Sequence, residues 1–237
     1  MPKSIFCILF LCPIISISQN YSAQEFRLTP APSENDTAWR TLDWSKFEFK
    51  VKMANTQLLI ERFEDDEDSC GLRYGNGTLV GYDHGEFGGR LEFVPDDTAK
   101  ENLLIKFHIN VKAIFRYNNS ICFLEGLSHM GLLRGGLYEL DTTNNAFNII
   151  PLLDFKDAPD AYTIYHNDIY IATSSGFCIV HNGSLKWVCK KAFWDGLYPN
   201  SVAVQDEENV FIGIRSGYVN LNTKKKKLRF YKYVGSN

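Results

Sequence analysis

The chain repeats itself. Residues 168–181 and 209–222 align without a gap, at an offset of 41 residues (209 minus 168). Ser175 and Gly176 then fall on Ser216 and Gly217. From residue 70 onward, four consecutive units each hold four short apolar segments separated by breaks. Units of about 40 residues with four strand-sized segments are typical of β-propeller blades.

The pattern predicts the strands of each unit. We expect them at 71–75, 78–83, 89–94 and 102–108; at 113–117, 120–125, 136–141 and 147–152; at 162–166, 168–173, 176–181 and 184–190; and at 201–205, 209–214, 217–222 and 227–233. The break between the first and second strands always contains asparagine (Asn76, Asn118, Asn119, Asn167 and Asn209). Asparagine tolerates the positive φ of a tight hairpin turn, so these breaks are predicted hairpins.

A further hairpin precedes the repeats. Apolar and charged residues alternate over 47–53, and a second apolar segment, 56–63, follows a short break. No long amphipathic helical pattern is present, so the predicted class is all-β. We expect a small β-propeller of four-stranded antiparallel blades in residues 45–237: four clear blades, and a fifth from this hairpin. The alternative is an irregular or open ring in which the hairpin is a cap.

The N-terminus has the features of an export signal. Lys3 precedes an apolar stretch, 5–17, that is shorter than the roughly 20 residues of a membrane-spanning helix. Small residues suited to cleavage stand at Ser16 and Ser18, or at Ser22 and Ala23. We assign 1–23 as a signal peptide and 24–44, which is rich in proline and polar residues, as a leader or linker. The mature protein is expected to be exported, periplasmic or secreted, without a membrane span or lipid anchor.

The charge and the cysteine content of the chain bear on whether it binds nucleic acid, forms disulfides or holds a metal. Beyond residue 23 there are 24 Lys and Arg (25 less Lys3) against 28 Asp and Glu, so no basic field for nucleic acid is expected. Four cysteines remain after the signal peptide (Cys70, Cys122, Cys178 and Cys189), which permits two disulfides in three connectivities. A two-residue turn at Asn182-Gly183 places Cys178 opposite Trp187 and only diagonal to Cys189. The cysteine spacing matches no zinc motif, and we predict no metal and no cofactor.

Two stretches carry a resemblance to known repeats. Asp168-Ile-Tyr-Ile-Ala-Thr-Ser-Ser-Gly-Phe and Val210-Phe-Ile-Gly-Ile-Arg-Ser-Gly-Tyr each join a strand to an aromatic strand through a Ser-Gly connection. They resemble the propeller repeats of two-component-regulator sensor domains, over the third and fourth units only. The resemblance implies a propeller fold and a role in ligand sensing.

The first two units differ from the others between their second and third strands. Both insertions, 81–93 and 126–140, have a histidine three residues after a glycine, then Gly-Gly, then a glutamate three residues on. Adjacent blades present such loops on the same rim of a propeller. We therefore name the candidate ligand-binding residues as Asp83, His84, Glu86, His129 and Arg134. A histidine beside carboxylates is also a possible general-base arrangement.

Other charged or aromatic groups are interpreted structurally. The acidic cluster 65–68 lacks the ligand spacing of a calcium loop and is expected to be linker, and the basic run 224–227 a solvated turn. Phe193, Trp194 and Tyr198 are expected to pack between blades. Arg215, like Arg134, is expected to be solvated or salt-bridged.

The predicted function is that of an exported, non-catalytic binding module that holds a protein or small ligand through one loop rim. One concrete version is an antitoxin-like immunity protein of bacterial competition. The alternative is an envelope hydrolase or lyase of the propeller type, with His84 as base and Glu86 or Asp83 as acid. The sequence contains no nucleophile elbow, dinucleotide fingerprint or phosphate loop.

Overall fold

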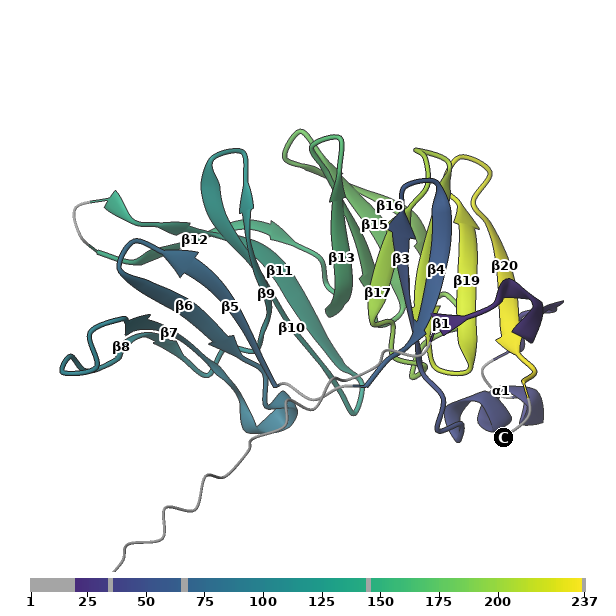
Figure 1. Cartoon of the computed structure of the whole chain (residues 1–237). Coiled ribbons are helices and arrows are strands. Elements are labelled where there is room, and N and C mark those ends of the chain that lie inside the picture. Colours follow the sequence, from purple (N-terminus) through teal and green to yellow (C-terminus); the bar gives the residue numbers. More distant parts are fainter. Residues whose placement is uncertain (1–19, 34–35, 65–67, 144–145, 236–237) are drawn as a thin grey trace, which may run out of the picture.

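The computed structural model describes residues 20–33, 36–64, 68–143 and 146–235. It contains five antiparallel sheets (Figure 1). In sheet order, the strands are β3 (Phe49–Ala54), β4 (Gln57–Arg62) and β1 (Asn20–Tyr21); β5 (Ser69–Tyr74), β6 (Gly77–Tyr82), β7 (Arg90–Pro95) and β8 (Leu103–Phe107); β9 (Val111–Tyr117), β10 (Ser120–His129), β11 (Leu132–Asp141) and β12 (Asn148–Asp154); β13 (Pro159–Tyr165), β14 (Asp168–Thr173), β15 (Gly176–His181) and β16 (Ser184–Lys190); and β17 (Ser201–Val204), β18 (Asn209–Ile214), β19 (Gly217–Asn222), β20 (Lys227–Tyr233) and β2 (Phe26–Thr29).

The sheets are the blades of a propeller. The first strand of each repeat lies innermost, and β5 packs on β9, β9 on β13, β13 on β17 and β17 on β3. We number the blades by their place in the chain, so blade 1 contains β3 and β4 and blade 5 contains β17 to β20. The prediction of an all-β propeller of antiparallel blades, with a fifth blade from the N-terminal hairpin, is confirmed. Blades 2, 3 and 4 have the predicted four strands, whereas blade 1 has three and blade 5 has five.

The hairpin turns follow from local backbone chemistry. Asn118 and Asn119 have φ values of 47° and 67°, and Asn167 has a φ of 64°. Asparagine adopts this left-handed conformation more readily than most residues, which explains its recurrence. The turn at Asn182-Gly183 also forms, and Cys178 is opposite Trp187 as predicted. The four described cysteines are free thiols.

The two insertions have different structures. The second was expected to be a loop, and this is wrong: β10 and β11 stay paired out to His129 and Leu132, so the insertion is an extended hairpin. The first contains a short 3-10 helix, η2 (Gly85–Phe87), which Asn110 holds through a 2.8 Å hydrogen bond from its Nδ2 to the Gly85 carbonyl oxygen.

The shared Gly-Gly motif marks close backbone approach. A Cβ on Gly89 would collide with the carbonyl oxygens of Tyr82 and Ile109, and one on Gly135 with that of Asp157. Both glycines therefore let an insertion lie against neighbouring backbone, which is a structural reason for the motif.

Residues 24–44, expected to be a leader or linker, contain a strand and a helix of the fold, and a further strand lies at Asn20–Tyr21, within the expected signal peptide 1–23. Strand β2 extends the last blade by pairing with β20, and β1 pairs with β4. Helix α1 (Thr37–Asp43) lies at one end of the propeller (Figure 1), and the Asp36 side chain caps it by accepting a hydrogen bond from the Ala38 amide. Tyr21 is only 8% exposed, inside the aromatic core between the first and last blades. The polar composition of this segment hid its few core residues.

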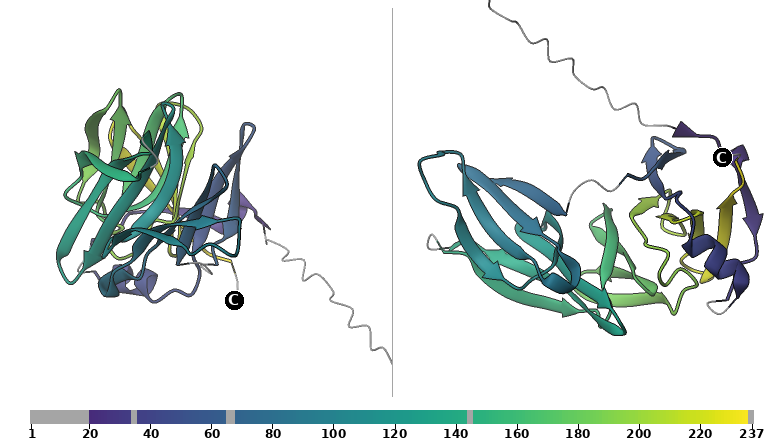
Figure 2. Two further views of the ribbon diagram at one scale, coloured as in Figure 1. Left: turned by 90° about the vertical axis from the view of Figure 1, so that its left-hand side faces the viewer. Right: turned by 90° about the horizontal axis from the view of Figure 1, so that it is seen from below.

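The ring is open between its first and second blades. Four hydrophobic clusters join blades 1 and 5, 5 and 4, 4 and 3, and 3 and 2. In the described parts of the chain, no such cluster or extensive packing joins β3–β4 to β5–β8. Figure 2 shows the resulting arc, interrupted where β4 leads to β5. Of the two predicted closures, the fifth blade is present but the ring is not complete.

Polar residues explain the opening. On blade 1, Lys52 forms a 2.6 Å ion pair with Glu61 on the face opposite the buried Val51 and Ile60. On blade 2, the face opposite the core carries Tyr82 and Glu92, joined by a 3.0 Å hydrogen bond. Blades bury apolar faces when they stack, and these two faces would have to desolvate charged groups instead.

None of the described helices is long and apolar enough to cross a membrane.

Candidate functional site

The cleft at the centre of the arc is the main candidate site. It has a volume of about 670 Å³. It lies at the end of the propeller at which the innermost strands begin, and we call this end the site end. All five blades or the connections beside them contribute to it. The lining residues are Lys46, Glu48, Arg62, Phe63, Glu64, Asp68, Ser69, Asp83, Val111, Lys112, Asp160, Tyr198, Pro199, Asn200 and Arg215.

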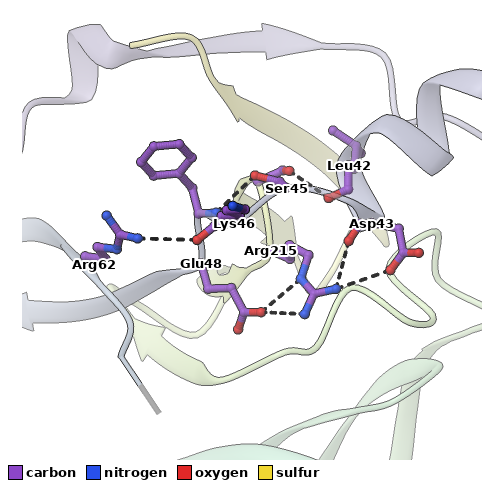
Figure 3. Close-up of polar contacts among 9 residues, drawn as sticks. Leu42, Asp43, Ser45, Lys46, Glu48, Arg62 and Arg215 are labelled. Carbon is purple, nitrogen blue, oxygen red and sulfur yellow. Dashed lines mark hydrogen bonds and ion pairs between the residues drawn. The ribbon is translucent and has the colours of Figure 1, made fainter. Parts of the chain in front are cut away.

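Arg215 organises one wall of this cleft (Figure 3). It follows β18, and its Nε and Nη2 donate to Glu48 Oε1 at 2.9 and 2.7 Å. Its Nη1 donates to the main-chain oxygen of Asp43, at the C-terminal end of α1, at 2.8 Å. The guanidinium also lies over the Tyr198 ring, 4.3 Å from its centroid. Arg215 thus ties α1 and the first blade to the last blade. The expectation of a salt-bridged arginine is confirmed.

Lys112 and Asp83 form the opposite wall. Lys112 Nζ is 2.5 Å from Asp83 Oδ2, and both side chains are about three-quarters buried. Asp83 Oδ1 also accepts a 2.9 Å hydrogen bond from the Gly85 amide, so this carboxylate is held in place by the insertion that follows it. The pair joins blade 2 to blade 3 across the inner end of their strands.

Asp160 lies at the start of β13 and has an unusual environment. Burial raises the pKa of its carboxyl group from the ordinary value near 3.8 to about 7. The negative charges of Asp157 and Asp83 add to this shift, whereas Lys112 and a 2.8 Å hydrogen bond from Ser174 Oγ oppose it. A desolvated carboxyl group whose pKa approaches neutrality is a marker of functional sites.

Asp157 lies close to Asp160 in the chain and is held by several hydrogen bonds. Its Oδ2 accepts hydrogen bonds from Thr173 Oγ1 at 2.6 Å and from Ser175 Oγ at 2.8 Å, and its Oδ1 accepts from the Ala158 amide at 2.9 Å. A buried carboxylate with this many donors is satisfied where it is. Asp157 therefore holds the connection before β13 and has little capacity left for a ligand.

The five predicted site residues are divided among several places at the site end. Asp83 lines the cleft. Glu86 and His129 meet on the outside, where the adjacent insertions contact each other and His129 Nε2 is 2.6 Å from Glu86 Oε2. Arg134 is paired with the buried Glu125. His84 is exposed beside the Tyr82 ring and does not line the cleft. His84, Glu86 and His129 thus do not form one concave surface.

The sequence reasoning missed Lys112 and Asp160. Both stand at the second position of an innermost strand, in β9 and β13. The polar residues Ser69 and Ser201 likewise begin the innermost strands β5 and β17. A polar residue at the start of the first strand of each repeat was the available signal, because these positions converge on the axis of a propeller.

The aromatic residues between β16 and β17 differ in burial. Trp194 is fully buried and donates from Nε1 to the Thr173 carbonyl oxygen at 3.1 Å, as packing between blades requires. Tyr198 is 55% exposed and lines the cleft beside Arg215, contrary to the packing prediction.

Exposed apolar side chains stand on the surface at the site end. Trp44, which follows α1, is 81% exposed, Phe87 of η2 is 84% exposed, and Met130 at the tip of the β10–β11 hairpin is 93% exposed. We call these three residues, with Tyr198, the apolar rim. Exposed apolar surface at the same end of a molecule as a cleft is a candidate for an interaction surface.

The described residues contain no group of three or more His, Cys, Asp or Glu side chains placed to hold a metal ion. Of the acidic cluster 65–68, residues 65–67 lie outside the described residues, and Asp68 lines the cleft.

Comparisons with known proteins yield distant structural likenesses. No protein-family model matches the chain, and no curated protein is significantly similar to it in sequence. A luciferin-regenerating enzyme matches 79% of this chain and 76% of its own, at 8% identity and a TM-score of 0.44. A chain of a nidogen/laminin complex is similar over 65% of this chain and 59% of its own length, at 10% sequence identity and a TM-score of 0.42. A GH43 endo-arabinanase from Bacillus licheniformis is similar over 76% of this chain and 79% of its own length, at 11% sequence identity and a TM-score of 0.39.

Proposed function

We propose that this chain is an exported, non-catalytic binding module whose ligand docks on the site end of the propeller. The observation that carries the proposal is the joint position of a charged cleft and an apolar rim. The cleft offers polar groups for orientation, and Trp44, Phe87 and Met130 offer apolar surface that water solvates poorly. Interfaces combine these two properties, with large apolar anchors near their centre.

The charged groups of the site favour binding over catalysis. Asp83, Glu86 and Arg134 are each engaged by a partner within the protein, and His84 stands apart from the cleft. A general acid and base must reach the same substrate atoms, and the arrangement of a hydrolase or lyase built on His84 with Glu86 or Asp83 would need these groups together. The ligand sensing implied by the resemblance of the third and fourth repeats agrees with a binding role.

The partner class that suits this surface best is a protein, as in the immunity-protein version of the hypothesis. A small ligand would be enclosed by the cleft alone and would leave the apolar rim exposed. A protein would cover both.

Capture from an envelope extract of the source organism tests this proposal. We expect the tagged full-length chain to retain a specific protein and the double variant Phe87→Ser, Met130→Ser to lose at least nine-tenths of it, because both side chains are anchors. Neither substitution removes core packing, so circular dichroism should be unchanged.

Ile164→Ser is the matched control. Ile164 is an exposed apolar residue near the far end of β13, away from the site end, and its substitution should leave capture unchanged. Equal capture by the rim variant and the wild type, or no specific capture by any form, would contradict the proposal.

Export is part of the same proposal and rests on the signal peptide predicted in residues 1–23. The burial of Tyr21 favours cleavage between Ser18 and Gln19 over cleavage after Ala23, which would remove β1 from the mature protein.

A further inference from the structure

The positive charges of the cleft are already bound within the protein. Arg215 is held by Glu48 and by the main chain of Asp43, and Lys112 is held by Asp83. Arg62 lies over the Phe47 ring, 5.0 Å from its centroid. Three of the four basic side chains that line the cleft therefore contact other side chains of the protein. The fourth, Lys46, is exposed at the edge of the cleft.

The negative charges are less completely used. Five acidic residues line the cleft; Glu48 and Asp83 take part in the ion pairs above, and Glu64 lies 3.9 Å from Arg62 Nε, which leaves Asp68 and Asp160 without an ion pair among the described residues. Asp160 accepts one hydrogen bond, from Ser174 Oγ. The Asp68 side chain has no hydrogen bond or ion pair with any other described residue. An incoming ligand thus meets carboxyl groups with vacant acceptor positions and few available cations.

Asp160 is the group whose state a ligand would change most. It is half-buried at the cleft wall and has no ion pair of its own, because the nearby ammonium of Lys112 is committed to Asp83. The charged groups that act on it are Lys112, Asp157 and Asp83, and burial outweighs them all, so the pKa of Asp160 is about 7. Near neutral pH, about half of such carboxyl groups carry a proton. A cation that arrives beside Asp160 would supply the missing partner and displace that proton.

We propose that the central cleft binds a primary ammonium or guanidinium group, held by Asp160 with Asp68 and Asp83 as neighbouring carboxylates. This inference rests on the proposed function and specifies the chemistry of the ligand. The cation is a lysine or arginine side chain of a protein partner, or a free amine. Binding is accompanied by the release of the Asp160 proton to solvent.

The test uses Nα-acetyl-lysine amide and Nα-acetyl-arginine amide as probes, with Nα-acetyl-glutamine amide as the uncharged control. We expect NMR titration of the full chain to show binding of the two cations and not of the control. Their affinity should rise about tenfold from pH 6 to pH 8, because the ionised fraction of a group with a pKa of about 7 rises by that factor.

Asp160→Asn separates this carboxyl group from the rest of the cleft. Asparagine has the shape of the protonated acid and still accepts from Ser174, so the fold should be retained. We expect the affinity for both cations at pH 8 to fall at least tenfold and its pH dependence to vanish. Asp96→Asn, at an exposed aspartate that pairs with Arg73 at the other end of blade 2, is the control and should change neither.

Equal binding of the glutamine control, or cation binding unaffected by Asp160→Asn, would overturn the inference. If the cation probes fail while rim variants still abolish capture of a protein, the ligand chemistry is wrong and the proposed function stands. A ten-residue peptide with a central lysine between leucines distinguishes the two sources. Tighter binding than the single-residue probe, lost on Phe87→Ser, indicates a protein side chain, and equal binding indicates a free amine.

Discussion

Arg215 illustrates how much of the site is held by a single side chain. Its guanidinium contacts the first blade through Glu48, the end of α1 through Asp43 and the cleft wall through Tyr198. The arginine side chain is 22% exposed, as is that of Glu48, so both charges are partly desolvated. Planar arginine suits this role because it donates in several directions at once.

We predict that Arg215→Met lowers the free energy of unfolding by about 2 kcal/mol, because it leaves a half-buried glutamate and a helix-end carbonyl without a donor. Arg73→Met is the matched control. The Arg73–Asp96 pair is more than half exposed, and because water screens exposed ion pairs its loss should lower the stability much less than Arg215→Met does. Urea unfolding followed by circular dichroism measures both values, and a smaller loss for Arg215→Met than for Arg73→Met would contradict the assigned role.

The residues of the cleft also show the limit of sequence reasoning at this scale. Asp83 was identified because it lies in an insertion that interrupts the repeat. Asp160 and Lys112 lie in regular strands, where one charged residue among alternating apolar and polar positions is unremarkable. Their importance comes from convergence on the axis, and that depends on how blades are placed relative to one another.

At the scale of elements, the N-terminal segment contributes to two blades. β1 adds the outer strand of blade 1, and β2 adds a fifth strand to blade 5 by pairing with β20. The Tyr21 ring packs edge-on against Phe49, with centroids 5.2 Å apart, and against Tyr233, with centroids 5.5 Å apart. Aromatic pairs of this kind stabilise beyond the area that they bury.

We predict that a chain beginning at Gln24 is less stable than one beginning at Gln19 by about 3 kcal/mol, because it lacks β1 and the buried Tyr21 ring. Thermal unfolding of the two forms measures the difference. Tyr21→Ala in the longer form should reproduce most of the loss. Equal melting temperatures for the two forms would show that β1 contributes nothing to the fold.

At the scale of the whole molecule, the open arc gives the five blades unequal surroundings. Blades 3, 4 and 5 have a packed neighbour on each side, whereas blades 1 and 2 each have one neighbour. In repeat architectures much of the stability of a unit comes from its interfaces with neighbours. The two blades at the opening should therefore be the least protected.

We predict that backbone amides of β4 and β6 exchange with deuterium at least tenfold faster than those of β14 and β18, which are the corresponding second strands of packed blades. Hydrogen exchange followed by mass spectrometry resolves these segments. Uniform protection across all five blades would mean that the ring closes in solution.

Most of the β-structure was determined by the sequence alone. Alternation of apolar residues, and asparagines able to adopt positive φ, are local properties, so β14, β15 and β16 of the fourth blade were predicted to the residue. Tertiary structure decided three other features: the opening of the ring, the incorporation of residues 20–44 and the composition of the cleft. Each of these depends on contacts between segments far apart in the chain. Tyr21 is core because Phe49 and Tyr233 pack against it, and the pKa of Asp160 is raised by burial and by the charge of Asp83, which lies far away in the chain.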